Sequence, residues 1–357
     1  MKLAYATVIG LLLLGAPSAR AECTVADIPS DGVTGFQEAV VSVADLSAAV
    51  STWREVGAFE VICRGKAGPA MAEFWGLPQD ADIDQVVLRK PGAGRGFIRL
   101  VAFNGVKQVQ IRSNGMPWDA GGIFDLYMYV DDVHAVFAQL RARGWQAYAD
   151  PVTYTLGPFT VTEIMARGPD GEVLCLMQRD APPYDKAQFS LVPARPGAAA
   201  PGFGWPFNAA LIFADFAPGA RLFGDILGWQ MHLSGDNTSK PPGDNPLGLP
   251  RNIAQTTSRK FAAYAPHPTD RNGSIQVLAN VGLEGRDFSA RAVPPNLGLL
   301  ALRVPVADLK VFADDFTARG GVIATPRRTL ALAPYGKVDI LAVTAANGAR
   351  IEFFAPE

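Results

Sequence analysis

The segment YMYVDDVHAVFAQLRARGWQAYADP, residues 127–151, contains one complete structural unit. Asp131 and Asp132 suit the start of a helix, because an aspartate side chain accepts hydrogen bonds from the free backbone N–H groups of the first turn. Gly144 suits its end, where the chain often takes a positive φ. The apolar residues before and after this helix predict strands, so the segment predicts strand, helix, strand.

Three other segments repeat this plan, and each is followed by further apolar strands such as GFIRLVAF (96–103) and GEVLCLMQ (171–178). Four copies of strand-helix-strand-strand-strand argue against a doubly wound parallel sheet, in which single strands alternate with helices. The three repeats are AVVSVADLSAAVSTWREVGAFEV (39–61), ALIFADFAPGARLFGDILGWQM (210–231) and ALRVPVADLKVFADDFTARGGVIATP (301–326).

The chain also divides into two similar halves. DDVHAVFAQLRARG (131–144) matches ADLKVFADDFTARG (307–320), and GLP occurs in each half. Between the halves, APPYDKAQFSLVPARPGAAAPGFGWP (181–206) is rich in Pro, Gly and Ala and has no helical or strand period, which is typical of a linker. A length of 357 residues fits two ordinary domains. We therefore predict domains at 31–180 and 205–357, joined by a linker at 181–204.

The N-terminus, MKLAYATVIGLLLLGAPSARA, has the pattern of an export signal. Lys2 precedes an apolar run, and Ala19-Arg20-Ala21 is the small-x-small pattern of a cleavage site. The apolar run is shorter than the about 20 residues that a membrane span needs. The sequence predicts a signal peptide at 1–21 and a periplasmic or secreted protein that leaves the membrane once the signal is cleaved.

Charge and cysteine content limit the partners and the redox state. A formal net charge of −2 and a pI near 6.0 provide no basic surface for nucleic acid or anionic lipid. The 3 cysteines of an exported chain allow at most one internal disulfide. We predict that Cys23 pairs with Cys63, which leaves Cys175 as a free thiol.

Three short patterns resemble a known family: V-x-D-L before a helix, L-x-A-R-G at its end, and P-D-G-x-x-x-x-L into the last strand. They are similar to the vicinal oxygen chelate superfamily, which includes glyoxalases, bleomycin-resistance proteins and extradiol dioxygenases. The resemblance implies an α+β fold in which four βαβββ modules pair into two cup-shaped antiparallel sheets with the helices outside. It also implies that each cup holds a small molecule, and that enzymes of the family hold a divalent metal there through His and Glu residues of the first and fourth strands.

The matching positions of this chain lack histidine. A permanently charged guanidinium among metal ligands adds repulsion, so we predict no metal and no other cofactor. A divalent metal held by Glu38, Asp125 and a Cys175 thiolate remains the alternative. In the first half the positions are Glu38, Arg99, Asp125 and Cys175, and in the second half they are Asn208, Gln276, Ala301 and Glu352.

The three histidines of the chain have plainer interpretations than metal binding. His134 falls on a solvated helix face, His232 on a strand, and His267 in a Pro-rich loop.

Strand alternation predicts the walls of the first cup, because every second side chain faces the same side of a sheet. Arg99 would bind a substrate carboxylate or enolate oxygen, and Glu38 or Asp125 would move a proton. The structural alternative is a buried ion pair that needs no substrate. The residues expected to face inward with these three are Phe97 and Val101, Val40 and Ser42, Tyr127 and Tyr129, and Val173, Cys175 and Met177.

Of these, Phe97, Tyr127, Tyr129 and Cys175 are the candidate substrate contacts. Cys175 is better interpreted as a small apolar filler than as a nucleophile, because no His or Lys is evident near it to activate the thiol. Two irregular stretches, residues 72–82 and 235–252, fall where they could cover the cups. Trp75 in the first stretch is the remaining candidate substrate contact.

Three functions remain open on the sequence. The first is a metal-independent lyase or isomerase acting on an aromatic or carboxylate-bearing compound. The second is a non-catalytic protein that sequesters a small molecule, and the third is a divalent-metal enzyme. The first requires a carboxylate base near an open cavity, whereas the second requires only apolar walls.

Overall fold

A computed structural model describes Cys23 and residues 35–156, 158–182, 202–238, 244–254, 257–267 and 270–357. The predicted signal peptide at 1–21 and most of the predicted linker lie outside these residues, so both stay predictions. In the part of the chain that is described, no helix combines the length and the apolar character needed to cross a membrane.

The described residues form four successive modules. The first two follow the predicted order of a strand, a helix and further strands. Module 1 contains β1 (Glu38–Ser42), α1 (Leu46–Glu55), β2 (Glu60–Lys66), α2 (Pro69–Phe74), β3 (Ile83–Arg89) and β4 (Phe97–Phe103). Module 2 contains β5 (Ile123–Val130), α3 (Val133–Arg141), β6 (Gln146–Ala147), β7 (Val152–Leu156), β8 (Phe159–Arg167) and β9 (Val173–Ala181).

The last two modules follow the same order, with a 3-10 turn, η3 (Ser289–Arg291), between them. Module 3 contains β10 (Asn208–Ile212), α4 (Phe216–Ala220), the π-helix η2 (Arg221–Ile226), β11 (Gln230–Thr238), α5 (Arg251–Ala254), β12 (Ser258–Ala265) and β13 (Ser274–Val281). Module 4 contains β14 (Gly298–Pro305), α6 (Leu309–Ala318), β15 (Ile323–Ala331), β16 (Lys337–Thr344) and β17 (Arg350–Pro356).

The first helix of each module begins at an aspartate, as the sequence predicts. The side chains of Asp45, Asp132, Asp215 and Asp308 accept hydrogen bonds from backbone N–H groups in the first turn of α1, α3, α4 and α6. After α3, Gly144 has a φ of 84°, which suits glycine because it lacks a Cβ. An aspartate therefore marks the change from strand to helix in all four modules, within V-x-D in modules 1, 2 and 4 and within Phe213-Ala214-Asp215 in module 3.

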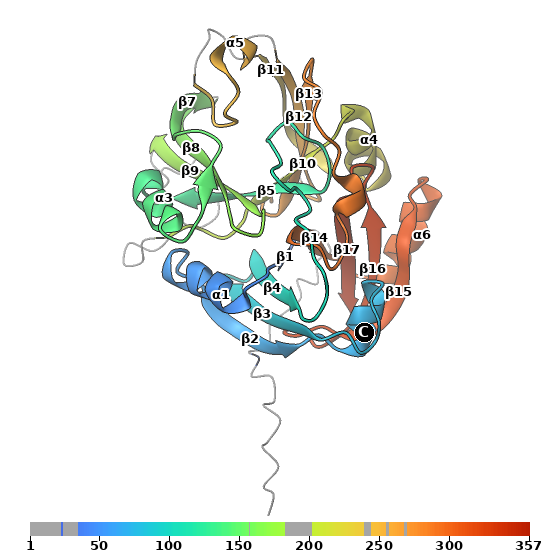
Figure 1. Cartoon of the computed structure of the whole chain (residues 1–357). Helices are drawn as coiled ribbons and strands as arrows, with labels where there is room; N and C mark the ends of the chain where they lie inside the picture. The colour runs from blue at the N-terminus through green and yellow to red at the C-terminus, as the bar shows by residue number, and fades with distance from the viewer. Residues whose placement is uncertain are drawn as a thin grey trace, which may run out of the picture.

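The modules pair in an order that the sequence did not predict. Module 1 joins module 4 in one sheet, with the order β15-β16-β17-β14-β1-β4-β3-β2. Module 2 joins module 3 in the other, with the order β11-β12-β13-β10-β5-β9-β8-β6 and β7 against β8. Figure 1 shows the blue and red ends of the chain together in the lower sheet and the green to orange middle in the upper one. The prediction that each half of the sequence forms its own cup is wrong.

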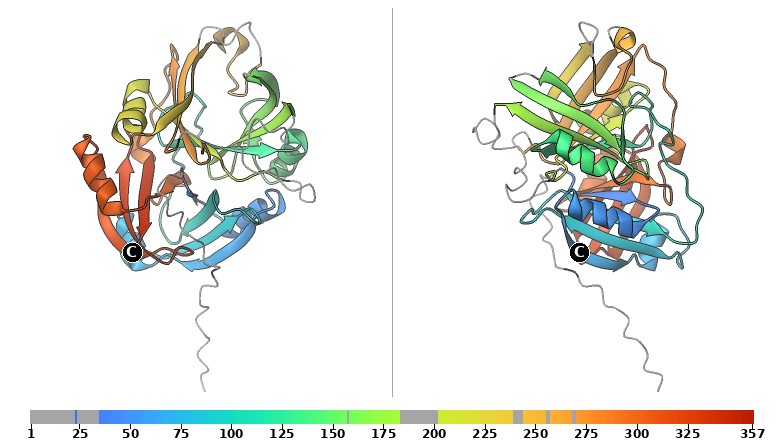
Figure 2. Two further views of the ribbon diagram at one scale, coloured as in Figure 1. Left: turned by 180° about the vertical axis from the view of Figure 1, so that it is seen from behind. Right: turned by 60° about the vertical axis from the view of Figure 1, so that its left-hand side comes forward.

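Both sheets are mixed rather than antiparallel. The two modules of each sheet meet through antiparallel first strands, β1 with β14 and β5 with β10. Within a module, the first strand lies parallel to the last, as β1 does to β4, because the chain returns to the starting end after the helix and two further strands. Figure 2 shows α1, α3, α4 and α6 outside the curved sheets. We name the module 1–module 4 sheet the first cup and the module 2–module 3 sheet the second cup.

The predicted strand alternation is confirmed. Ala39 and Val41 of β1 pack in the large core beneath the helices, whereas Val40 packs inside the first cup. In β9, Leu174 and Leu176 face the helices, and Cys175 faces the inside of the second cup. Alternate side chains of one strand therefore serve two different cores.

The predicted disulfide is also confirmed, since Cys23 is bonded to Cys63 in β2. Cys175 is a free, buried thiol. The bond attaches the N-terminal segment to the edge strand of the first cup.

A close backbone contact joins the two cups. The Phe36 N–H donates to the Gly273 carbonyl at 2.9 Å, just before β1 and β13 begin. A Cβ added to Gly35 would lie 2.2 Å from the same carbonyl oxygen. Only glycine fits this approach without moving one of the two segments.

We expect Gly35→Ala to lower the free energy of unfolding by about 1–3 kcal/mol, because the added methyl group overpacks a backbone contact. Denaturant unfolding measures the change. Gly94→Ala is the matched control, since a Cβ there would meet nothing within 4 Å. Equal stabilities for the two variants would contradict the contact.

Candidate functional site

The floor of the first cup is a network of buried ions. Glu38, Arg99, Arg303 and Glu352 have 0% exposure. Arg99 donates to both oxygens of Glu38, from Nε to Oε1 at 2.7 Å and from Nη2 to Oε2 at 2.9 Å. Two parallel bonds of this kind form the strongest geometry between a guanidinium and a carboxylate.

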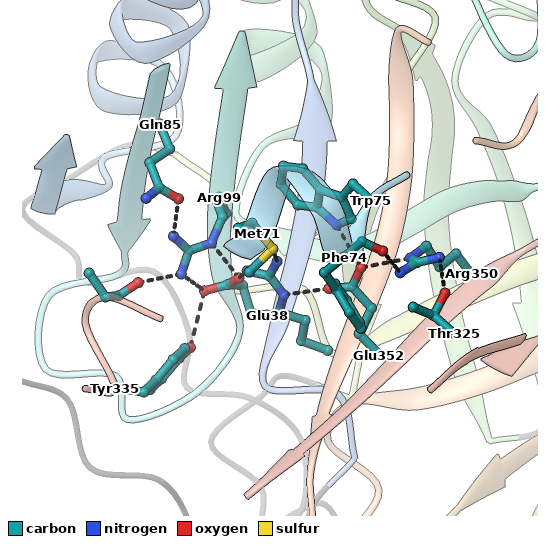
Figure 3. Close-up of polar contacts among 12 residues, drawn as sticks. Glu38, Met71, Phe74, Trp75, Gln85, Arg99, Thr325, Tyr335, Arg350 and Glu352 are labelled. Carbon is teal, nitrogen blue, oxygen red and sulfur yellow. Dashed lines mark hydrogen bonds and ion pairs between the residues drawn. The ribbon is translucent and has the colours of Figure 1, made fainter. Parts of the chain in front are cut away.

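Arg303 connects the two carboxylates across the sheet. Its Nη1 donates to Glu38 Oε1 and its Nε to Glu352 Oε2, both at 2.7 Å. Arg350 donates from Nε to Glu352 Oε1, also at 2.7 Å. Figure 3 shows the network as a row, with Arg99 beside Glu38 at one end and Arg350 beside Glu352 at the other.

Neutral side chains complete the network. The Tyr335 hydroxyl donates to Glu38 Oε2 at 3.2 Å, and Trp75 Nε1 donates to Glu352 Oε1 at 2.8 Å. The ring of Phe97 stacks on Tyr335 with centroids 6.1 Å apart. Each oxygen of Glu38 and of Glu352 thus has a protein donor, and the predicted contacts Trp75 and Phe97 form part of a packed interior.

The network keeps both carboxylates ionised. Burial by itself would raise the pKa of Glu38, but the charges and hydrogen bonds of Arg99 and Arg303 lower it below its usual range. For Glu352, burial is outweighed in the same way by Arg303 and Arg350, which lower the pKa to about 2. The charged groups at the floor of the first cup are therefore paired with one another.

The second cup contains a cavity of about 440 Å³. This volume falls within the range of small-molecule sites. The segment containing Asn245 and Leu247 covers one side of the cavity, as expected for residues 235–252. Asn245 holds this turn through two hydrogen bonds to the backbone of Leu249. Six aromatic side chains line the cavity: Phe124, Tyr127, Tyr129, Tyr154, Phe207 and Phe261.

Acidic groups lie on the β5–β9 side of this cavity. Glu163 of β8 lines it and accepts a hydrogen bond from the Tyr154 hydroxyl. Asp125 of β5 lies deeper, where its Oδ1 accepts the Ala210 N–H at 3.3 Å and its Oδ2 has no partner among the described residues. Cys175 lies within hydrogen-bonding reach of Glu163 and of Tyr127.

Burial makes these groups hard to ionise. It raises the pKa of Glu163, and it raises the pKa of Asp125 well above the usual range, with the charge of Glu163 adding to the effect. The pKa of the Cys175 thiol is also raised, first by burial and then by Glu163 and Asp125. Cys175 is thus a buried neutral thiol, which fits its interpretation as a filler better than that of a nucleophile.

The module 3 side of the cavity provides a cation and amides. Arg259 of β12 lines the cavity, and its charge opposes the effect of burial on the pKa of Glu163. Asn208 accepts from Ser274 Oγ at 3.1 Å and donates from Nδ2 to Gln276 Oε1 at 3.2 Å. The Gln276 Nε2 group has no acceptor among the described residues, so its N–H groups are available to a ligand.

Neither cup fits the divalent metal that the resemblance implies. In the first cup the carboxylate oxygens are bonded to guanidinium groups, which repel a cation. In the second cup the corresponding positions offer Asp125, a neutral thiol and the amides of Asn208 and Gln276. Across the described residues, no group of three or more His, Cys, Asp or Glu is arranged to hold a metal ion.

The structure separates the predicted site residues. Glu38 and Arg99, with Phe97 and Trp75, belong to the first cup, whereas Asp125, Tyr127, Tyr129 and Cys175 belong to the second. The expectation that Arg99 lies between Glu38 and Asp125 is therefore wrong, because their strands pair in different sheets. Asn208 and Gln276 share the second cup, and Ala301 and Glu352 the first.

Sequence reasoning missed four charged residues, which are Arg303 and Arg350 of the first cup and Glu163 and Arg259 of the second. Arg303 lies opposite Glu38 in the β1–β14 pairing, two positions beyond Ala301, where the count from the helix stopped. Glu163 and Arg259 were missed because they lie on β8 and β12, whereas the predicted positions came only from the first and last strands of each module. The available signal was one charged residue inside an apolar strand, as in GLLALRVP and FTVTEIMAR.

Comparisons with solved structures agree with this architecture. No family model and no curated protein matches the chain. Glyoxalase I from Zea mays superposes with a TM-score of 0.57 at 14% sequence identity, over 90% of this chain and 92% of that one. A putative dioxygenase from Bacillus subtilis subsp. subtilis str. 168 gives a TM-score of 0.53 at 13% identity, over 90% and 85%. The chain has the vicinal oxygen chelate fold.

Charge complementarity stabilises the observed module order within this vicinal oxygen chelate fold. In the observed pairing, Glu38 and Glu352 meet Arg99, Arg303 and Arg350. If module 1 paired with module 2 instead, Arg303 would lose Glu38. A buried charge without a partner is strongly unfavourable, so the observed order is stabilised by the ions that it brings together.

We expect Arg303→Met to lower the free energy of unfolding by about 3–5 kcal/mol, because it removes one partner from each of two buried carboxylates. Denaturant unfolding of the purified protein measures the loss. Lys310→Met is the control, since Lys310 pairs with Asp314 at the surface and the two side chains are 73% and 66% exposed. That exposed pair contributes at most about 1 kcal/mol. A small change in Arg303→Met would show that the network is dispensable.

Proposed function

We propose that the protein binds a small aromatic molecule in the second cup. The observation that carries this proposal is the cavity of about 440 Å³ with its six aromatic side chains, at a place where the matching floor of the first cup is filled by ion pairs. Apolar walls with a few convergent polar groups are the usual features of a small-molecule site. The fold supports binding of a small molecule. Because one fold hosts many functions, it does not identify that molecule.

The walls favour a flat ring. Tyr129 and Phe207 already stack with centroids 4.4 Å apart, and Phe261 and Tyr127 add further ring surface. Aromatic pairs of this kind contribute beyond simple burial of area. Arg259 and the Gln276 amide lie on the same wall, so a carboxylate or another oxygen on the ligand would find donors there.

A metal-independent lyase or isomerase is the second candidate. The presence of Glu163, a carboxyl group, and Arg259, a cation, on the wall of one cavity favours it over pure sequestration. In this proposal Glu163 and Arg259 take the roles that the sequence suggested for Glu38 or Asp125 and for Arg99. A non-catalytic binding protein requires only the aromatic walls.

We expect Leu233→Trp to weaken binding of 4-nitrophenol at least tenfold, because Leu233 lines the cavity and is 42% exposed, so a larger side chain there narrows its mouth. Isothermal titration calorimetry gives the affinities, with nitrobenzene as an uncharged second probe. Met231→Trp is the matched control on the same strand, since Met231 is 57% exposed and does not line this cavity. Equal weakening by both variants would place the ligand elsewhere.

We also propose that the protein is exported to the periplasm or secreted. The signal pattern at residues 1–21 supports this location, as does a disulfide between Cys23 and Cys63, because such bonds persist in oxidising compartments. N-terminal sequencing of the protein from a bacterial expression host is expected to begin at Glu22. An intact Met1 in the purified protein would contradict the proposal.

A further inference from the structure

Glu163 has an unusual position for a carboxyl group. It lies on β8, which is next to the edge of the second cup, with 3% exposure, and it is part of the cavity wall. Its neighbours in the sheet are Val152 of β7 and Met177 of β9, which provide no charge. A buried carboxyl group without an ion-pair partner is costly, so its retention in an apolar wall calls for a role.

Five titratable groups face Glu163 from the surrounding strands, and one of them is Tyr127 of β5, whose pKa the charge of Glu163 raises. The Tyr154 hydroxyl of β7 donates to its Oε2, and the Cys175 thiol of β9 lies within hydrogen-bonding reach. Asp125 of β5 interacts with it as a second acid. Arg259 of β12 is the cation that interacts with it from the module 3 side.

These neighbours favour proton exchange at Glu163. Tyr154 and Cys175 can supply hydrogen bonds to a carboxylate, and burial raises its pKa, which makes that carboxylate a stronger base than one in water. A base is most effective when its pKa lies near the working pH. Asp125 does not line the cavity, so Glu163 is the carboxyl group of this pair that a ligand can touch.

We propose that Glu163 exchanges a proton with the molecule bound in the second cup, and that Arg259 stabilises the negative charge left on that molecule. The O–H or N–H bond of the ligand breaks, its electron pair stays on the ligand, and a new O–H bond forms on the Glu163 carboxylate. The total charge of the pair does not change. Binding of an aromatic ligand in this cavity, as proposed above, is the condition on which this step rests.

The chemistry of the walls defines the ligand class. The ring lies among the aromatic side chains, and a weakly acidic O–H or N–H group on it points between Glu163 and Arg259. The free N–H groups of Gln276 favour an oxygen at the same end. A purely apolar ring would fill the cavity without using these three polar residues.

The test uses the full protein and 4-nitrophenol, whose neutral and ionised forms absorb at different wavelengths. In the wild type, the bound probe and Glu163 share a proton, so ionisation of the probe is expected in two coupled steps as the pH rises. In Glu163→Gln the probe has no such partner, and a single step is expected. Arg259→Ala is expected to shift ionisation of the bound probe to higher pH by at least about one unit, a tenfold change, because the anion loses its cation.

Matched variants control for general effects. Lys260→Ala removes the next cation on β12, which is exposed and does not line the cavity, and Asp236→Asn removes an exposed acid of β11. Neither is expected to change the titration of the bound probe. If Glu163→Gln does not fold, Tyr154→Phe replaces it, because loss of this hydrogen bond raises the pKa of Glu163 and moves the first step to higher pH.

The outcomes separate the two proposals. Two steps in the wild type and one in Glu163→Gln support proton exchange. Tight binding with identical titrations in the wild type and Glu163→Gln, or in the wild type and Tyr154→Phe, overturns it and leaves the binding cup in place. Failure of the wild type to bind either 4-nitrophenol or nitrobenzene overturns the binding proposal and the inference together.

Discussion

Arg303 holds the first cup together, because it is the residue that bonds to both buried carboxylates. It comes from β14 and reaches Glu38 of β1 and Glu352 of β17, so one side chain joins three neighbouring strands. A buried ion network is stable only when its members are all paired, and removing one leaves the others without compensation. The pairing of the first module with the last and the closed floor of the first cup both depend on this contact.

The two cups show how one fold gives different interiors. In the first, acids and guanidinium groups are balanced, and the acids stay ionised. In the second, Asp125 and Glu163 lie close together, and neither forms an ion pair in the described part of the chain. Burial then raises their pKa values, and the polar groups that remain are available to a ligand beside the aromatic walls.

This protein shares its fold with the solved structures that it matches, but its site residues do not form a metal site of the kind that the fold implies. The architecture matches glyoxalase I of Zea mays at a TM-score of 0.57, yet identity is 14% and the positions that the resemblance reserves for metal ligands contain no histidine. Chemistry depends on particular side chains, and the same fold hosts many functions. The proposals therefore depend on Glu163, Arg259 and the cavity around them.

The sequence by itself determined the local structure, which consists of four modules, helices that begin at Asp45, Asp132, Asp215 and Asp308, and strands with alternating faces. These features depend on neighbours in the chain, so periodicity and capping reveal them. Only the tertiary structure decided which modules pair, because all four share one local pattern and each first strand could pair with several others. Glu38 and Arg303 are 265 residues apart, and a contact over that distance leaves no periodic trace in the sequence. For the same reason, the sequence placed the site within the first half of the chain, whereas the structure builds the cavity from module 2 of the first half and module 3 of the second.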